Sequence, residues 1–138
     1  MIKMILLKFP MKKINLNRIF SLPTTRCDFQ DRNGYCALGK LISEATGEVD
    51  LQPRTVYFFE DIATKVIDNP IAKHFFEDLY SKLSGKFVTE IATMNDKGET
   101  DKALKLLIQK AIECGVVELD NESLELSKEL LTLDKVVV

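Results

Sequence analysis

The chain has 138 residues, of which 46% are hydrophobic and 29% are charged, and this composition suits one globular domain with a sizeable core. Its three cysteines are few and odd in number, which argues against a disulfide framework and favours a cytoplasmic compartment. No apolar run approaches 18 residues, and residues 1–9 lack the apolar core and cleavage site of a signal peptide. Neither a membrane span nor a secretory leader is therefore expected.

The formal net charge of -2 is unevenly distributed. Residues 1–40 contain eight Lys/Arg and two Asp, a net of +6, whereas the remainder contains eleven Lys/Arg and nineteen Asp/Glu, a net of -8. This basic head could contact nucleic acid or an acidic partner, or it could dock on the acidic part of its own chain. We favour docking of this basic segment on the acidic part of the same chain, and no module that reads nucleic acid is recognisable. A nucleic-acid-binding accessory protein is kept as an alternative function.

The first 23 residues alternate loosely between apolar and polar side chains and are interrupted by Pro10 and Pro23. This pattern predicts an N-terminal arm that contains one or two short strands. The polar residues 24–34 follow as a turn that ends in Asn33-Gly34.

Four helices are expected between residues 35 and 114. The first spans residues 35–46 and ends at Gly47, which is a favourable C-cap. The third begins at Asn69-Pro70, and the fourth spans residues 100–114. The second, over residues 56–68, is predicted because four apolar side chains recur at helical spacing: Phe58, Phe59, Ile62 and Val66.

The remaining segments are shorter. Residues 87–94 fit either a strand or a short helix, since periodicity alone does not decide, and residues 95–99 predict a turn. In the tail, residues 116–120 fit a strand and residues 122–131 a short helix. The sequence therefore predicts a mainly α single domain, a compact bundle of four to five helices with one or two short β-strands at the N-terminal arm and near the C-terminus. Its parts are an arm (1–23), a helical core (35–114) and a tail (115–138).

The stretch GYCALGKL at residues 34–41 matches the first seven positions of a phosphate-binding loop. Such a loop needs a Ser or Thr for magnesium at the next position, where this chain has Leu41, and it follows a buried strand. The preceding residues 26–33 are mostly polar. No nucleotide or other cofactor is expected.

On the helix predicted for this stretch, small side chains share one face: Cys36, Gly39 and Ser43. Such a face permits the close approach of another backbone segment or of a ligand. Cys36 would also place a thiol at the start of a helix, where the helix dipole lowers the pKa of a thiol and favours the reactive thiolate.

Thiol catalysis needs a base, and His74 is the only histidine. Its helical position is far from the apolar face, so a dyad with Cys36 would require another element to fold over it. A cysteine-dependent hydrolase or transferase that uses Cys36 and His74, with Asp96 assisting, is kept as an alternative, but catalysis is not the favoured function.

A metal site is not expected. The four candidate ligands lack the close-paired spacing of zinc sites: Cys27, Cys36, His74 and Cys114. The acidic turn at residues 95–99 lacks the 12-residue ligand pattern of a calcium loop.

Two segments together resemble a family of small bacterial and phage proteins of unknown function. Residues 35–41 (YCALGKL) are similar to the WCALGAL-type signature of that family. Residues 91–98 (IATMNDKG) and the helix after them resemble its later I-x-x-W-N-D turn and L-x-x-A-I helix. The resemblance covers about residues 30–115, and Tyr35 and Met94 depart from it because the family has Trp there.

The resemblance implies a helical fold and an association with phage or mobile DNA, but no catalytic residue. It also implies that Cys36 lies near the Asn95-Asp96 turn. Asn95 or Asp96 would then accept backbone N–H groups at a helix start, as such residues usually do.

The sequence thus predicts a small non-enzymatic, phage-like binding or interaction protein, with a host-interaction, anti-defence or virion-associated role in the host cytoplasm or in a virion. The partner would be a protein or a small ligand, and neither nucleic acid nor a membrane is expected. A homo-oligomer is kept as a further possibility, in which residues 1–9 would form a strand exchanged between subunits. The candidate binding residues are Cys36, Gly39, Ser43, Asn95 and Asp96.

Overall fold

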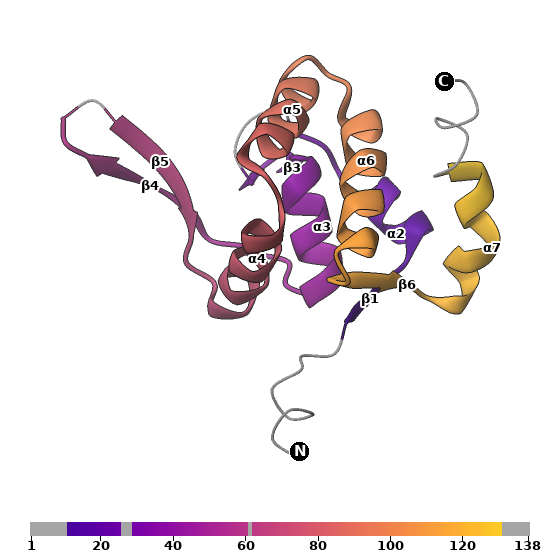
Figure 1. The fold of residues 1–138 in the computed structure, drawn as a ribbon. Helices are drawn as coiled ribbons and strands as arrows, with labels where there is room; N and C mark the ends of the chain where they lie inside the picture. Colours follow the sequence, from indigo (N-terminus) through magenta and orange to yellow (C-terminus); the bar gives the residue numbers. More distant parts are fainter. Residues whose placement is uncertain (1–10, 26–28, 61, 131–138) are drawn as a thin grey trace.

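The computed structural model describes residues 11–25, 29–60 and 62–130, with side-chain environments as far as residue 126. This part of the chain contains six helices and six short strands (Figure 1). The helices are α2 (Leu16–Ser21), α3 (Ala37–Thr46), α4 (Pro70–Lys82), α5 (Gly85–Asp96), α6 (Thr100–Glu113) and α7 (Asn121–Leu130). The strands are β1 (Lys12–Ile14), β2 (Gln30–Asp31), β3 (Gly34–Tyr35), β4 (Pro53–Phe58), β5 (Ile62–Ile67) and β6 (Val117–Leu119).

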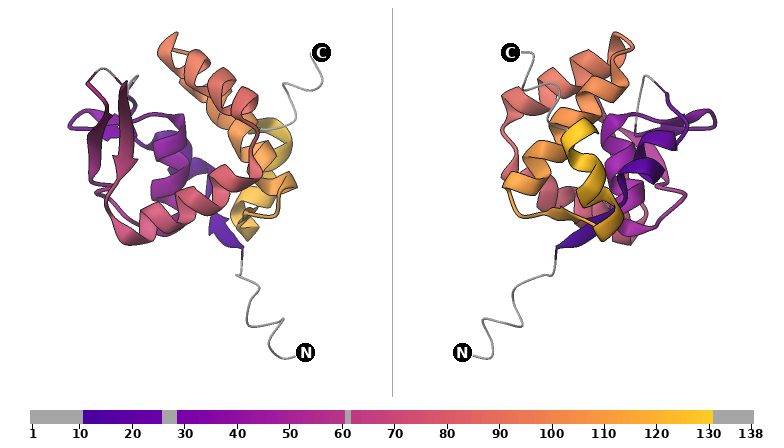
Figure 2. Two further views of the ribbon diagram at one scale, coloured as in Figure 1. Left: turned by 60° about the vertical axis from the view of Figure 1, so that its left-hand side comes forward. Right: turned by 90° about the vertical axis from the view of Figure 1, so that its right-hand side faces the viewer.

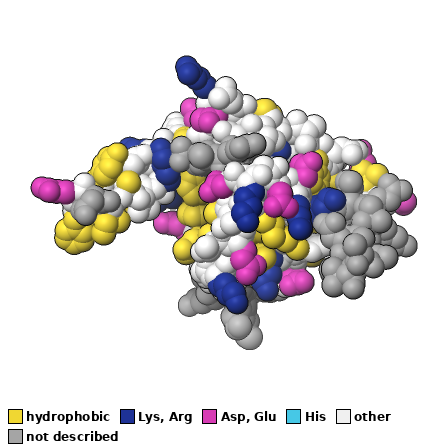
Figure 3. All heavy atoms as spheres, turned by 90° about the horizontal axis from the view of Figure 1, so that it is seen from above, with side chains coloured by type: hydrophobic (Ala, Val, Ile, Leu, Met, Phe, Trp, Pro, Cys, Tyr) yellow, Lys and Arg dark blue, Asp and Glu magenta, His cyan; other side chains and the backbone are white. Residues whose placement is uncertain are grey.

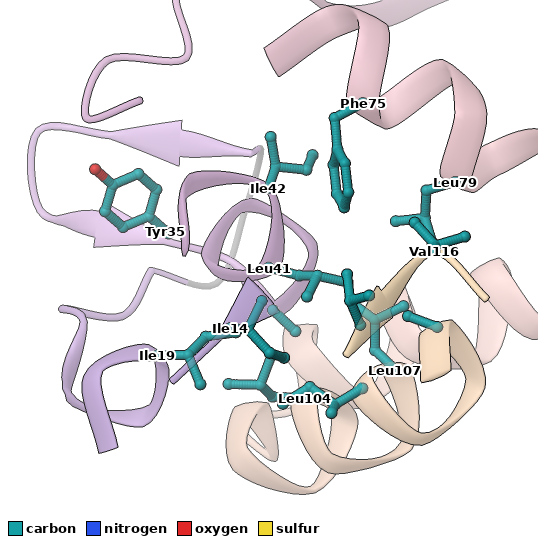
Figure 4. Close-up of a cluster of buried hydrophobic side chains, with 14 of the residues drawn as sticks. Ile14, Ile19, Tyr35, Leu41, Ile42, Phe75, Leu79, Leu104, Leu107 and Val116 are labelled. Atoms are coloured by element: carbon teal, nitrogen blue, oxygen red, sulfur yellow. The ribbon is translucent and has the colours of Figure 1, made fainter. Parts of the chain in front are cut away.

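The hydrophobic core is built around α3, which packs against α2, α4 and α6. Figure 4 shows Ile42 of α3 beside Phe75 of α4, whereas Leu41 lies on the side of Leu107 in α6. The helix ends where the sequence predicts, because Gly47 adopts a left-handed φ of 76° and its N–H donates to the carbonyl of Ser43 at 2.8 Å. The central position of α3 means that every candidate residue on it is surrounded by other elements.

The N-terminal and C-terminal parts of the described chain are joined by β1 and β6, which pair in parallel (Figure 2, right, with α7 in yellow). Next to this pair, the backbone N–H of Leu16 donates to the hydroxyl of Ser123 at 2.7 Å. The Asn15 amide donates to Asp120 at 2.9 Å and to Glu122 at 3.1 Å. Part of the N-terminal segment is thus held by acidic groups of the tail.

The predicted helix over residues 56–68 is wrong, because this region forms the antiparallel hairpin of β4 and β5, which projects from the body in Figure 1. The side chains at 58, 59, 62 and 66 match helical spacing, but they belong to a segment rich in β-branched and aromatic residues, which favour strands. Phe59 adopts a left-handed φ of 59°, which turns the chain between the strands. Pairing with a neighbouring strand therefore overrides the helical pattern.

The structure also changes the account of two shorter segments. Within the predicted N-terminal arm, β1 is a strand, but residues 16–21 form α2, which begins where the Asn15 side chain accepts the N–H of Arg18 at 2.9 Å. Residues 87–94, which were compatible with either state, lie inside α5, and Ser84 caps this helix through the N–H of Phe87 at 3.1 Å. In the tail, β6 and α7 agree with the predicted strand and helix, although residue 131 lies outside the described part.

The chain is therefore helix-rich with short strands, as the sequence predicts at this coarse level, but it has more helices and more strands than expected. Among the helices described, none is both long and apolar enough to cross a membrane.

Candidate binding site

The small-residue face of α3 is covered by this chain itself. A Cβ atom added at Gly39 would lie 2.9 Å from the carbonyl carbon of Phe29, and closer still to its oxygen. The hydroxyl of Ser43 donates to the carbonyl of Glu48 at 2.8 Å. Gly39 and Ser43 thus contact backbone of the same chain, and neither lines a described pocket.

Cys36 is the N-cap of α3. Its Sγ accepts the backbone N–H of Gly39 at 3.4 Å, and its own N–H donates to the Phe29 carbonyl at 3.3 Å. The side chain is half-buried at the edge of the cavity described below. In this structure Cys36 helps to begin a helix, which is a structural role.

Asn95 joins the end of α5 to the start of α3. Its side-chain oxygen accepts the N–H of Ala37, the first residue of α3, at 2.9 Å, and its amide donates to the carbonyl of Thr25 at 3.2 Å. The residue is only 3% exposed. The proximity of Cys36 to the Asn95-Asp96 segment, expected from the resemblance, is present in the structure, and Asn95 does accept an N–H at a helix start. That helix, however, begins 58 residues earlier in the chain.

A pocket of about 260 Å³ lies where α3 and α5 meet. Its wall is mainly apolar and includes Phe29, Leu38, Leu83, Phe87, Val88, Ile91, Ala92 and Leu107. Polar side chains complete it: Cys36, Lys65, Asn95 and Asp96. Three of the five predicted binding residues are thus brought together at one cavity, and the apolar wall was not predicted as part of the site.

His74 lies elsewhere. It is exposed on α4 and lines a second hollow together with Thr46 at the C-terminal end of α3. Cys36 stands at the opposite end of this ten-residue helix, about 15 Å away along its axis. A catalytic thiol and its base must come within hydrogen-bond reach of each other. The structure brings Cys36 to the same pocket as Asp96 but not to His74, so the Cys36–His74 dyad is not formed.

Two cations of the basic N-terminal segment interact with other groups of the same chain. Arg18 forms a bidentate ion pair with Glu44 at 2.8 and 2.7 Å. Lys40 is buried, with 1% of its surface exposed, and its ammonium donates to the Thr24 hydroxyl at 2.6 Å. Burial lowers the pKa of the Lys40 amine from its usual value, although the Asp101 carboxylate opposes this shift. These two cations are therefore held by groups of this chain.

The other cations of this segment divide into two sets. Lys12, Lys13 and Arg32 are exposed, whereas Lys3, Lys8 and Arg26 lie outside the described residues. The idea of residues 1–9 as an exchanged strand falls outside them as well.

The hairpin carries exposed apolar side chains, three of which (Phe58, Phe59 and Ile62) belong to the set that predicted a helix over residues 56–68. Tyr57 is 68% exposed, Phe58 53%, Phe59 85% and Ile62 53%. Figure 3 shows hydrophobic atoms gathered at the outer end of the hairpin. The signal that could have found this feature is the run TVYFF at residues 55–59, because five consecutive β-branched and aromatic residues favour a strand.

Metal ligands do not gather in the described part of the chain, where no group of three or more His, Cys, Asp or Glu side chains could hold an ion. Of the candidate ligands, Cys27 is outside the described residues, and Cys36 and Cys114 are thiols rather than halves of a disulfide.

Comparison of the chain with protein-family models, with curated proteins and with solved structures gave no match. Membership of the family with the WCALGAL-type signature therefore stays a prediction.

Proposed function

We propose that this chain is a small non-enzymatic interaction protein and that a partner protein inserts an apolar side chain into the pocket between α3 and α5. The observation that carries the proposal is the pocket itself, an apolar cavity at the point where the predicted binding residues Cys36, Asn95 and Asp96 meet. Protein interfaces obtain much of their binding energy from one or two aromatic or aliphatic anchors that fill such cavities.

The size and chemistry of the pocket favour a side chain over a larger ligand. Its volume of about 260 Å³ lies just below the range of roughly 300–1,000 Å³ that is usual for small-molecule sites. The lining residues Leu38, Phe87 and Ile91 offer dispersion contacts and no side-chain hydrogen bonds. Asp96 and Lys65, both exposed, also line the pocket and supply polar groups for backbone or charged groups of the partner.

The hydrogen bonds around the pocket also support a binding role. The Asn95 side chain holds the start of α3 and the carbonyl of Thr25 with two hydrogen bonds. The Phe29 carbonyl is held by the N–H of Cys36. A preformed cavity lowers the cost of ordering side chains on binding, which leaves more of the contact energy as affinity.

The resemblance to bacterial and phage proteins supports a partner in a bacterial cell, either of the host or of the phage. The cysteine-hydrolase alternative has less support, because the one histidine and Cys36 line different hollows. The nucleic-acid alternative loses part of its basis, because Arg18 and Lys40 interact within the chain.

Filling the pocket provides the test. Ala92 is exposed and lines the pocket from α5, so Ala92→Trp should place a ring in the cavity without removing a core side chain. Thr93→Trp is the matched control, since its neighbour Thr93 is exposed on the same helix and lies outside the pocket lining. Immobilised wild-type protein and both variants would be incubated with lysate of the source organism, and bound proteins quantified by mass spectrometry.

We expect at least one protein to be retained by the wild type and by Thr93→Trp and to be lost, by about tenfold or more, with Ala92→Trp. In parallel, the fluorescence of the apolar dye anilinonaphthalenesulfonate should rise with the wild type and the control but not with Ala92→Trp. If Ala92→Trp quenches dye binding and yet retains the same proteins, the partner does not use the pocket, and the proposal is wrong.

A further inference from the structure

The second hollow, which we call the α4 hollow, lies where α4, the end of α3 and the start of β1 meet. Its volume is about 350 Å³, and its wall is mainly apolar, with Ile71 and Phe75 from α4 and Val116 from the segment before β6. Phe75 and Val116 are buried, but Ile71 is 55% exposed. The described part of the chain therefore leaves an apolar side of this hollow uncovered.

The β1–β6 pair ends beside the α4 hollow. Lys12, the first residue of β1, lines the hollow, and its N–H donates to the carbonyl of Val116 at 3.2 Å. Lys12 pairs with the first residue of β6, Val117, and the chain before β6 turns at Gly115, which has a φ of 75°. Pro10 also lacks the N–H that a longer ladder would need. The ladder therefore cannot continue toward the N-terminus, and the residues before β1 need another place.

Residues 1–9 (MIKMILLKF) are apolar at seven of nine positions, the exceptions being Lys3 and Lys8. A run of this kind gains free energy when it leaves water for an apolar surface. It is also joined to β1 by only two residues, which gives it an effective concentration on the order of millimolar at the hollow. A separate chain or a free ligand would need a comparable concentration to compete for the same cavity.

We propose that the N-terminal segment of this chain docks in the α4 hollow, with Leu7 and Phe9 inserted against the wall formed by α4 and Val116. In an extended segment alternate side chains point to the same side, so Leu7 and Phe9 enter together while Lys8 faces solvent. The hollow is larger than the pocket between α3 and α5, and we therefore assign it two side chains rather than one.

The length of the segment fits the hollow. Ile71 and Asp78 line it from the same face of α4 and lie about 10 Å apart along the helix axis. Four extended residues span about 13 Å, so residues 6–9 can cover this distance. The occupant is therefore within reach without any rearrangement of the described body.

Charge does not select the occupant. The lining includes the cationic Lys12 as well as Asp78, and the Asp78 carboxylate already lies 3.3 Å from the ammonium of Lys82 on the same helix. The choice of residues 1–9 over another partner rests on their apolar side chains and on their attachment to β1. Docking covers Ile71 and closes this hollow, whereas the pocket between α3 and α5 stays open. The inference does not depend on that pocket.

The experiment introduces a fluorescent probe into the segment. The chain contains no tryptophan, so Phe9→Trp in the full chain gives a single indole signal. Its emission should lie at shorter wavelength than in the same protein unfolded in urea. With an undocked population of at most about 10%, acrylamide should quench the folded protein about fivefold less than the unfolded one.

Two substitutions of exposed apolar side chains separate docking from a general effect. Ile71→Asp, added to Phe9→Trp, puts a charge into the wall and should return emission and quenching to the unfolded values. Val49→Asp is the matched control, because Val49 is 76% exposed and lies outside the lining of the α4 hollow, and it should change neither quantity. Far-ultraviolet circular dichroism checks that each variant keeps its helices.

Two substitutions within the segment test which side chains enter. In the Phe9→Trp background, Leu7→Ser should increase acrylamide quenching, whereas Lys8→Ser should leave it unchanged. Sedimentation equilibrium should give the 15.7 kDa mass of one chain.

The proposal is overturned if the indole of Phe9→Trp is as exposed in the folded protein as in urea, or if Ile71→Asp leaves its signal unchanged. Equal effects of Leu7→Ser and Lys8→Ser would refute the insertion of Leu7. A protected indole together with a doubled mass would show that the segment docks on a second copy, which also overturns docking within one chain.

Discussion

Gly39 offers a direct test of how α3 is packed. Replacing it with alanine should improve the intrinsic helix propensity by up to about 1 kcal/mol. The new Cβ, however, would stand 2.9 Å from the carbonyl carbon of Phe29 and 3.3 Å from the Cβ of Tyr35. The nearest obstacle is backbone, which cannot rotate away as the end of a flexible side chain can. The segment that contains Phe29 must therefore withdraw from α3.

The cost of this withdrawal can be estimated from two contributions. Overpacking of a well-filled site typically costs about 1–3 kcal/mol. The hydrogen bond from the N–H of Cys36 to the Phe29 carbonyl, 3.3 Å long, would be weakened or lost at about 1 kcal/mol. After subtraction of the propensity gain, Gly39→Ala should lower the free energy of unfolding by about 1–3 kcal/mol, which corresponds to a fall in Tm of roughly 3–10 °C.

Gly85→Ala is the matched control, because Gly85 is also helical but has no heavy atom within 4 Å of an added Cβ. It should leave the free energy of unfolding unchanged or raise it by up to about 1 kcal/mol. Thermal and urea unfolding, followed by far-ultraviolet circular dichroism, would compare the two variants with the wild type. If Gly39→Ala is as stable as the wild type, or if both variants are destabilised equally, close packing against the Phe29 backbone is refuted as the reason for a glycine on this face.

Two further predictions concern the polar contacts that hold the ends of the helices. Asn95→Ala leaves the buried N–H of Ala37 without its acceptor and should lower the free energy of unfolding by about 1–3 kcal/mol. Asp96→Ala, at the exposed neighbouring position, is the control and should change the free energy of unfolding by less than about 0.5 kcal/mol. Equal urea midpoints for the two variants would contradict the assignment of Asn95 as the cap of α3. The Asn15 side-chain hydrogen bond lowers the pKa of Asp120 from its usual value of 3.8, so the stabilisation from the charged carboxylate is present above that pH and is lost as the pH falls through the lowered pKa. Thermal unfolding of the wild type and of Asp120→Asn between pH 6 and pH 2 should therefore show a stability difference that narrows below about pH 4, and a constant difference would contradict this assignment.

The helical elements around α3 follow closely from local sequence signals. Gly47 ends α3, and Asn69-Pro70 begins α4, where the Asn69 side chain accepts the N–H groups of Ile71 and Ala72 at 3.1 Å. These contacts join residues only two to four positions apart, so they are encoded by short stretches of sequence and form in any tertiary context that permits a helix.

The candidate site was predictable only in part. The resemblance placed Cys36 near Asn95 and Asp96, and the structure has this proximity. The apolar wall of the pocket was not visible in the sequence, because its side chains come from α3, the end of α4, α5, α6 and the segment before β2. Each of these side chains, taken alone, resembles an ordinary core position. The close approach suggested by Cys36 and Gly39 is made by the Phe29 backbone, which the sequence could not identify as the contacting segment.

Sequence patterns were sufficient to predict that the chain is helix-rich, where α3, α4 and α6 lie, and that the face of Gly39 permits the close approach of another group. Long-range packing was needed to establish that residues 53–67 form a hairpin and that Asn95 caps a helix that begins 58 residues earlier. The apolar residues of the hairpin fit a helical period as well as a strand, and only pairing between β4 and β5 selects the strand. Likewise, Asn95 can cap α3 only after α5 has packed beside it, because a hydrogen bond between distant segments depends on the packing that brings them together.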